Sequence, residues 1–302
     1  MHETITFKKI TIEDKNWVKQ RLAQSGFNGC DYCFGNMFIW SSAYHHEIAD
    51  YKGFLLVKAR IKGRIIYFFP AGSGDLSQAV RGLAVYCANN GHSLIFANIT
   101  NDNIAALEVL FPGAFSCTEN RDASDYIYLR EKLVTLSGKK YHGKRNHIAR
   151  FKDNPNWAYE PVSGKNIEEC YEMSVSWHKK YREAECNESY QNEINVIRLA
   201  FKHFHELDFD GGLIRLDGSV AALTMGERLN SSAYVIHIEK AMHHIQGAYA
   251  IINQQFAEHL PPDIKYINRE EDLGDEGLRR SKLSYYPEIL LAKFDAVLVK
   301  NL

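Results

Sequence analysis

Residues 267–287 read INREEDLGDEGLRRSKLSYYP and place a dense polar cluster between a predicted strand and a predicted helix. Residues 264–268 form a short apolar run that indicates a buried strand, whereas the spacing of Leu278 and Leu283 indicates a helix. Asp275 is placed to cap this helix, because its carboxylate can accept hydrogen bonds from the free amides of the first turn. Open sheets bind ligands at such points, since the chain turns away there and leaves a crevice. A solvated turn is the alternative interpretation.

The same stretch resembles the signature of the DUF2156 family, which is related to the C-terminal domain of phosphatidylglycerol lysyltransferases. The matching residues are Ile267, Asn268, Arg269, Glu270, Asp272, Gly274, Leu278, Arg279, Lys282, Tyr285 and Pro287. A second block matches at residues 138–148 and ends in Phe151, and shorter matches occur at residues 247–249 and 252–253. The likeness therefore spans most of the chain.

Composition and charge limit the classes of protein to consider. The chain has 302 residues, of which 45% are hydrophobic and 24% are charged, as in ordinary globular proteins. Its formal net charge is -1, so any surface for polyanions must be a local patch. No run approaches the ~20 apolar residues of a membrane span, and no apolar signal core opens the chain. We therefore expect a cytoplasmic protein without the membrane domain of full-length lysyltransferases. The oligomeric state is not decided by these features.

The cysteines do not predict a metal site. Cys30 and Cys33 are the only closely spaced pair, and a single Cys-x-x-Cys pattern can be a redox pair or half of a zinc site. No second pair supplies the other two ligands of a four-coordinate zinc ion. We therefore interpret this pair as ordinary packing.

The order of predicted elements indicates an α+β fold in two copies. Residues 135–302 predict a strand, two helices, three antiparallel strands, a helix, a strand, a helix and a closing hairpin at residues 289–299. Asp217-Gly218 marks the clearest hairpin, because this pair favours the turn that matches strand twist. Residues 1–134 predict nearly the same order. This order resembles the GCN5-related N-acetyltransferase (GNAT) fold. We therefore expect tandem GNAT-like domains, each a mostly antiparallel central sheet flanked by helices.

Residues 137–152 are strongly basic and contain no acidic residue before Asp153. One interpretation is a solvated helix that joins the two domains. The other is a face that binds the phosphates of a coenzyme, of a transfer RNA end or of a phospholipid head group. Lys144 and Arg145 flank a narrow apolar seam, so these two residues and the neighbouring Asn146 are candidates to contact phosphate.

The donor of an acyl group is predicted to bind near residues 239–248, where a helix N-terminus offers free amides to a pyrophosphate. Acetyl-coenzyme A users show the pattern Gln/Arg-x-x-Gly-x-Gly/Ala at this place. With Gly247 as the first glycine, His244 and Tyr249 break the pattern and argue against coenzyme A. The resemblance implies an aminoacyl-tRNA donor instead, so acyl-CoA and aminoacyl-tRNA are the two candidate donors. Residues 72–74 occupy the equivalent place in the first copy, which we expect to be structural or accessory.

Acyl transfer requires that the acceptor loses a proton and that the carbonyl oxygen is held as negative charge develops on it. Glu239, Glu270 and Asp272 are candidates to bind a cationic acceptor amine or an aminoacyl group. Tyr285 is the candidate proton donor, because GNAT enzymes often place a tyrosine on this helix. The predicted substrate or phosphate contacts are Lys144, Arg145, Asn146, Gly247, Asn268, Arg269, Arg279 and Lys282. Ion pairs along the last helix are the alternative interpretation of the cationic residues in it.

Two functions follow from these patterns. The first is an acyltransferase, aminoacyl- or acyl-transferring, whose site lies in the second copy and whose acceptor is a small molecule or a lipid head group. The second is a binding module without catalysis, which uses the basic residues 139–152 to hold RNA or anionic lipid head groups.

Overall fold

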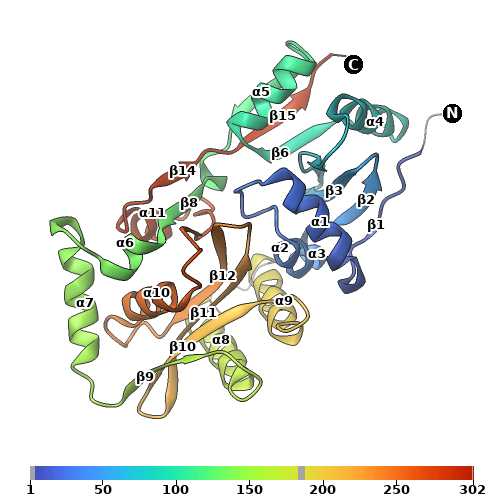
Figure 1. Cartoon of the computed structure of the whole chain (residues 1–302). Coiled ribbons are helices and arrows are strands. Elements are labelled where there is room, and N and C mark those ends of the chain that lie inside the picture. Colours follow the sequence, from blue (N-terminus) through green and yellow to red (C-terminus); the bar gives the residue numbers. More distant parts are fainter. Residues whose placement is uncertain (1–3, 183–187, 301) are drawn as a thin grey trace. The chain divides into compact units, whose positions relative to one another are not determined.

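The computed structural model describes residues 4–182, 188–300 and 302, and the chain forms two compact units (Figure 1). The first unit comprises Met1–Asp125, Glu271–Arg279 and Leu290–Leu302, and the second comprises Tyr126–Glu270 and Arg280–Ile289. This division differs from the predicted boundary at residue 134, because segments from the end of the sequence return to the first unit.

The first unit is built on an eight-stranded sheet with the order β1-β2-β3-β4-β6-β15-β7, in which β5 also pairs with β3. Its strands are β1 (Lys8–Lys9), β2 (Glu47–Tyr51), β3 (Phe54–Ile61), β4 (Arg64–Tyr67), β5 (Ala71–Gly72), β6 (Ile95–Ile99), β7 (Phe115–Glu119) and β15 (Phe294–Leu298). Its helices are η1 (Ile12–Asp14), α1 (Lys15–Ser25), α2 (Phe34–Ile39), α3 (Ser41–Tyr44), α4 (Leu76–Asn89), α5 (Asn101–Leu110) and η2 (Arg121–Ala123).

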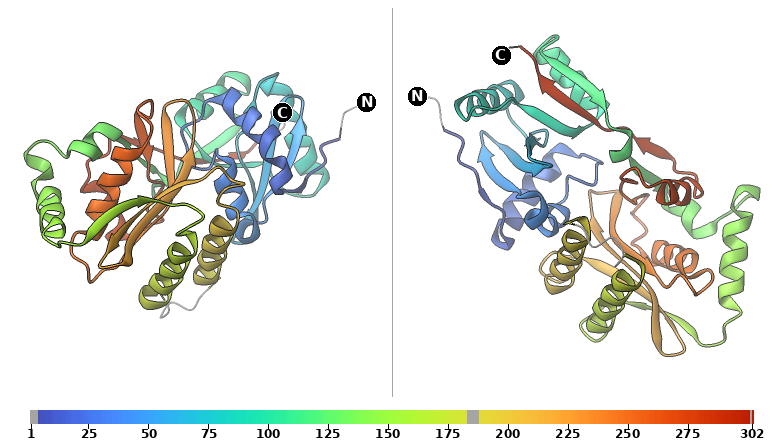
Figure 2. Two further views of the ribbon diagram at one scale, coloured as in Figure 1. Left: turned by 60° about the horizontal axis from the view of Figure 1, so that its bottom comes forward. Right: turned by 180° about the vertical axis from the view of Figure 1, so that it is seen from behind.

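The second unit is built on a seven-stranded sheet with the order β14-β8-β13-β12-β11-β10-β9. Its strands are β8 (Asp125–Leu129), β9 (Trp157–Pro161), β10 (Asp210–Leu216), β11 (Ser219–Arg228), β12 (Ala233–Ala241), β13 (Tyr266–Asn268) and β14 (Ile289–Leu291). Its helices are α6 (Arg130–Thr135), η3 (Lys139–Tyr141), α7 (His142–Lys152), α8 (Ile167–Arg182), α9 (Glu188–Lys202) and α10 (Ala248–His259). The division between the two units passes through α11 (Glu276–Leu283). Figure 2 shows α8 and α9 on one face of this sheet and α10 on the other.

The two sheets repeat one pattern. Four antiparallel strands lead to a parallel pair, which is β4 and β6 in the first sheet and β12 and β13 in the second. The next strand in each sheet is antiparallel and comes from the other half of the sequence: β15 joins the first sheet and β8 joins the second. The predicted closing hairpin at residues 289–299 is therefore wrong, because β14 and β15 belong to different sheets.

Local turn chemistry confirms the predicted hairpin at Asp217-Gly218, and a second hairpin has the same kind of turn. Asp217 and Gly218 connect β10 to β11 with φ values of 48° and 82°, and Lys62 and Gly63 connect β3 to β4 with φ values of 50° and 80°. Two-residue turns with positive φ at both positions match the twist of the flanking strands. Each turn therefore sets the register of the two strands that it connects.

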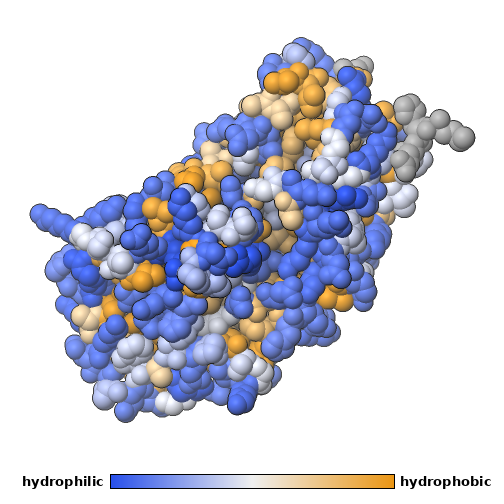
Figure 3. Space-filling model, in the orientation of Figure 1, coloured by the Kyte–Doolittle hydropathy of each residue, from blue (hydrophilic) through white to orange (hydrophobic). Residues whose placement is uncertain are grey.

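The core of the second unit lies between its sheet and the helices α7 and α10. Tyr234 of β12 and Phe256 of α10 pack edge to face there, with ring centres 5.6 Å apart. On the surface, hydrophobic side chains gather over α11 and β14 (Figure 3), where Leu283, Tyr286 and Ile289 are exposed. Among the described helices, none combines the length and the hydropathy that crossing a bilayer requires.

A buried ion cluster holds the first unit together. The ammonium of Lys293 lies 2.6 Å from Asp31 and 2.7 Å from Asp125, and its side chain is 1% exposed. Burial by itself lowers the pKa of Lys293, but the surrounding anionic groups outweigh burial and raise this pKa well above its usual range. Cys30, Asp125 and Glu271 offer three grouped metal-ligand atoms, and Lys293 is the cation that bonds to Cys30 and Asp125.

We predict that Lys293→Met lowers the free energy of unfolding by about 3–5 kcal/mol, because it leaves buried carboxylates without their counter-charge. Urea denaturation at neutral pH measures the effect, with the exposed Lys300→Met as the matched control. A loss below about 1 kcal/mol would contradict a structural role for this cluster.

Candidate active site

A β-bulge in β12 decides which way Glu239 points. In the β11–β12 ladder Met225 pairs with Ile238 and Gly226 pairs with Ile236, so His237 is the extra residue. Side chains alternate between the two faces of a strand, and one extra residue reverses the alternation beyond it. Glu239 therefore lies on the face that is covered by α10, together with Ile236.

Glu239 forms a nearly buried ion pair with Arg269, the residue that follows β13. The guanidinium and the carboxylate are 2.6 Å apart, and the two side chains are 11% and 10% exposed. Asn253 of α10 donates from Nδ2 to the second carboxylate oxygen at 3.5 Å. Thr224 of β11 is the cross-strand partner of Glu239, so its hydroxyl lies on the same face.

Three polar atoms in this group are buried and have no hydrogen-bond partner among the described residues: Thr224 Oγ1, Asn253 Oδ1 and Arg269 Nη1. A buried polar atom without a partner costs about 1–3 kcal/mol, and such atoms are rare in native proteins. Two of these atoms can accept a hydrogen bond and one donates. The arrangement therefore suits a ligand that presents both a donor and an acceptor beside Glu239.

Lys144 and Tyr285 complete the group. The Lys144 ammonium lies 3.9 Å from the centre of the Tyr285 ring, and the Arg269 guanidinium lies 5.0 Å from the same centre. Burial, together with the positive charge of Arg269, lowers the pKa of Lys144 to about 8. Burial also raises the pKa of Tyr285 to about 12, with Arg269 opposing and Glu239 adding to the rise. At neutral pH the lysine is thus cationic and the tyrosine keeps its proton.

The backbone at Arg269 is fixed from two directions. Its amide donates to Tyr126 O at 2.9 Å, and the ammonium of Lys282 donates to its carbonyl oxygen at 2.6 Å. The side chain of Asn268 accepts from the amide of Glu270 at 2.8 Å. Lys282 and Asn268, both predicted as substrate contacts, are therefore placed where they hold the chain around Arg269.

Glu270 lies beside the bulge. Its carboxylate is 2.8 Å from Nδ1 of His237, and the other ring nitrogen of His237 is 3.1 Å from the carboxylate of Glu227. The side chain of His237 is thus buried between two carboxylates. The predicted catalytic role of Glu270 stays a prediction.

Asp272 and Arg279 belong to the first unit. The fully buried carboxylate of Asp272 accepts from Arg279 at 2.8 Å and from Arg121 at 3.3 Å, and Arg279 also pairs with Asp122 at 2.7 Å. Asp275 caps α11 as expected, through a bond of 2.7 Å from the amide of Leu278. Asp272 and Arg279 are thus engaged in ion pairs, and their predicted roles with substrate stay predictions.

The remaining predicted contacts lie on or against α7. Arg145 donates to the carbonyl oxygens of Leu136 and Gly138, and Asn146 is exposed and bonds to His142 along the helix. Gly247 packs against α7 so closely that an added Cβ would lie 2.2 Å from the carbonyl oxygen of His147. Only glycine fits this position.

Residues 22–297 match the family model described as phosphatidylglycerol lysyltransferase, C-terminal. The chain belongs to this family. Among solved structures, a conserved protein of unknown function from Bacteroides thetaiotaomicron is 37% identical, with a TM-score of 0.93 over 98% of this chain and 100% of that one.

More distant members and neighbours share the fold. L-PGS from Bacillus licheniformis is 16% identical, with a TM-score of 0.64 over 94% of this chain and 91% of that one. FemX is 8% identical, with a TM-score of 0.59 over 98% of each chain. A curated relative, an uncharacterized protein of Mycoplasmoides gallisepticum, is 25% identical over 58% of this chain, and the match covers 56% of that relative's length. The fold is thus the expected tandem GNAT-like one, and the family points to an acyltransferase.

Sequence reasoning gave no role to two residues of the site. Thr224 is a lone hydroxyl in the apolar run of β11, and Asn253 interrupts the apolar face of α10. A buried polar residue in an apolar run is the signal that could have found both, although only the bulge shows that they meet Glu239.

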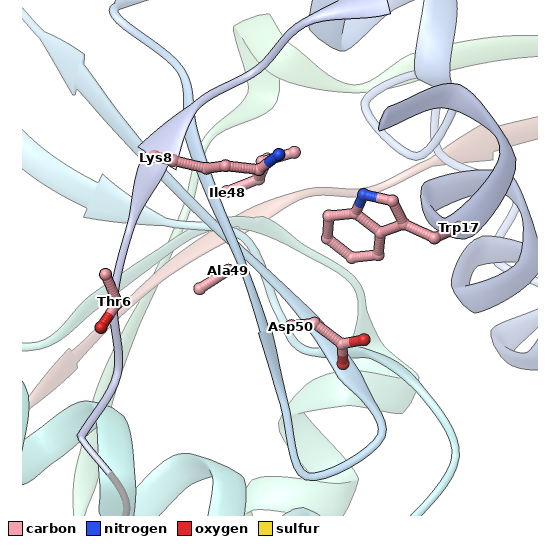
Figure 4. Close-up of a pocket in the computed structure, with 6 residues that line it drawn as sticks. All are labelled: Thr6, Lys8, Trp17, Ile48, Ala49 and Asp50. Carbon is pink, nitrogen blue, oxygen red and sulfur yellow. The ribbon is translucent and has the colours of Figure 1, made fainter. Parts of the chain in front are cut away.

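The first unit also has a hollow of about 250 Å³ lined by Lys8, Trp17 and Asp50 (Figure 4), and it contains none of the predicted site residues.

We predict that Gly226→Ala disrupts the bulge and turns Glu239 away from Arg269, because an added Cβ would lie 1.8 Å from the carbonyl oxygen of Val235. We expect a loss of about 2–3 kcal/mol in the free energy of unfolding and a loss of any transfer activity. Gly164→Ala is the control, since its Cβ would meet no atom within 4 Å. Unchanged stability and an unchanged amide spectrum of β12 by NMR would show that the bulge does not depend on Gly226.

Proposed function

We propose that this protein transfers an aminoacyl group from an aminoacyl-tRNA to an amine or hydroxyl acceptor, a small molecule or a lipid head group. The observation that supports it is the set of buried, unpartnered polar atoms around Glu239. An aminoacyl ester offers an ammonium group to the acceptor atoms and a carbonyl oxygen to the donor atom. An acyl group without an amine would leave Thr224 and Asn253 without partners.

The ammonium of the aminoacyl group binds beside Glu239 in this proposal. Its three N–H donors can reach the carboxylate, Asn253 Oδ1 and Thr224 Oγ1, which all lie on one face of the sheet. Charge-assisted hydrogen bonds are stronger than neutral ones, so this part of the substrate supplies orientation as well as affinity.

Arg269 acts on the reacting carbonyl group. One side of its guanidinium is held by Glu239, which leaves Nη1 to donate to the carbonyl oxygen as negative charge develops there. Such a donor is effective because it is already oriented and shielded from water before the reaction. The buried position of Arg269 satisfies both conditions.

Lys144 and Tyr285 serve the leaving group. When the acceptor attacks the carbonyl carbon, the ester bond to the ribose oxygen breaks, and that oxygen needs a proton. Tyr285 keeps its proton at neutral pH and gives it to this oxygen, and the proton released by the acceptor restores it. The Lys144 ammonium over the tyrosine ring stabilises the negative charge of the leaving nucleotide.

We predict that Asn253→Leu and Arg269→Lys each lower kcat/KM for aminoacyl transfer by about 100-fold or more, since each removes an oriented hydrogen-bonding atom. Transfer from radiolabelled aminoacyl-tRNA to candidate acceptors measures the rate. Gln255→Leu, on the same helix and outside the group, is the control. Variants that fold normally and transfer at the wild-type rate would refute this site.

We also predict that transfer falls as pH rises above about 8, because Lys144 then loses its positive charge. A guanidinium stays charged over this range, so Lys144→Arg keeps its rate to higher pH than the wild type. The ratio of kcat/KM for the two proteins between pH 7 and pH 9.5 isolates this ionisation from that of the acceptor. An identical pH profile for both proteins would exclude a role for the charge of Lys144.

Exposed basic residues on and before α7 favour the second candidate, a binding module for RNA or anionic lipid head groups. Lys139, Lys140, Arg150 and Lys152 are exposed there. Binding through such residues weakens steeply with salt. Strong salt-dependent binding without transfer of any acyl donor would favour this candidate over the enzyme.

A further inference from the structure

Three aromatic rings form a ledge at the end of β12, and we refer to Tyr181, His243 and Tyr249 as the aromatic ledge. The rings of Tyr181 and His243 are stacked with centres 4.0 Å apart and planes 26° apart. The centre of the Tyr249 ring lies 5.9 Å from that of His243. His243 and Tyr249 are exposed, so the ledge presents ring surface to solvent although aromatic residues usually bury theirs.

The ledge is held from below and is therefore preformed. The indole N–H of Trp177 donates to Ala241 O at 2.8 Å, and its ring meets His243 edge to face at 5.5 Å. The amide of His243 donates to the hydroxyl of Tyr181 at 3.2 Å. These bonds orient the rings before any ligand arrives, which lowers the entropy lost on binding.

Two lysines, Lys180 and Lys240, lie near the ledge, and Lys240 pairs with Glu193 at 2.6 Å. Burial together with Lys180 and Lys240 lowers the pKa of His243, so its ring is neutral at neutral pH. Burial and the carboxylate of Glu239 raise the pKa of Tyr249 to about 12. Tyr249 thus lies within the electrostatic reach of Glu239, the residue at the centre of the proposed site.

We propose that the aromatic ledge stacks the adenine base at the end of the acyl donor, with His243 and Tyr249 as the contacting rings. Exposed aromatic rings beside lysines are the arrangement with which proteins hold unpaired bases next to phosphates. This inference rests on the proposed function for the position of the acyl group. Coenzyme A and the end of an aminoacyl-tRNA both carry adenine, so the shared chemistry is an adenine nucleotide.

The experiment measures binding of three probes to the full chain by calorimetry: AMP, coenzyme A and an RNA hairpin that ends in CCA. We expect His243→Ala and Tyr249→Leu each to weaken binding of AMP by about ten-fold, the effect of losing one base stack. The neighbouring exposed His244→Ala is the matched control and changes binding less than two-fold. Because His243 is exposed, its variant tests the ledge even where Tyr249→Leu fails to fold.

Removing the terminal adenosine from the hairpin identifies the source. If this removal weakens RNA binding by the wild type but not by His243→Ala, the RNA end lies on the ledge. If only the binding of coenzyme A depends on His243, coenzyme A lies there. No binding of AMP, or equal binding by the wild type and His243→Ala, would overturn the inference.

The two proposals fail separately. If Arg269→Lys loses transfer while His243→Ala binds the donor as tightly as the wild type, the proposal for the ledge is wrong and the proposed enzyme stands. If adenine binding depends on His243 but no donor supports transfer, the proposed enzyme is wrong and the proposal for the ledge stands.

Discussion

The ammonium of Lys293, buried between Asp31 and Asp125, fixes the points at which the chain passes between the two sheets. Asp125 begins β8, which joins the second sheet, and Lys293 directly precedes β15, which joins the first. Both exchanged strands therefore start at the same ion pair. A charge buried without its partner is strongly destabilising, so the cluster favours this connectivity over one in which each strand stays in its own half.

The exchange matters for chemistry because β13 has only three residues, Tyr266–Asn268. It is paired on both sides, in parallel with β12 and antiparallel with β8. A short strand held from both edges can carry Arg269 in one orientation, with part of its guanidinium free of internal partners. Leaving such atoms unpaired costs about 1–3 kcal/mol each, and the sheet around them makes this cost tolerable until a ligand supplies the missing bonds.

Local signals in the sequence predicted much of the fold, because a turn such as Asp217-Gly218 depends on its own residues. The prediction of the closing hairpin failed for the opposite reason, because β14 and β15 pair with strands from the first half of the sequence and not with each other. The polar stretch 267–287 was expected to form one crevice. Its members instead divide, since Arg269 and Tyr285 join Glu239 and Lys144 while Asp272 and Arg279 pair in the first unit. Periodicity alone did not reveal the bulge at His237.

The two parallel strand pairs differ in the side chains around them, and this difference favours an active site in the second unit. In the first unit, Tyr67 of β4 is paired with Phe96 of β6, and both side chains are fully buried. Further aromatic rings, Phe69 and Phe115, pack on Phe96 at 5.6 Å and 5.8 Å. The equivalent region of the second unit holds an ion pair and polar atoms without partners. Aromatic side chains fill the space around the first strand pair and stabilise the fold, whereas the second pair keeps unpaired hydrogen-bonding atoms that a bound ligand can use.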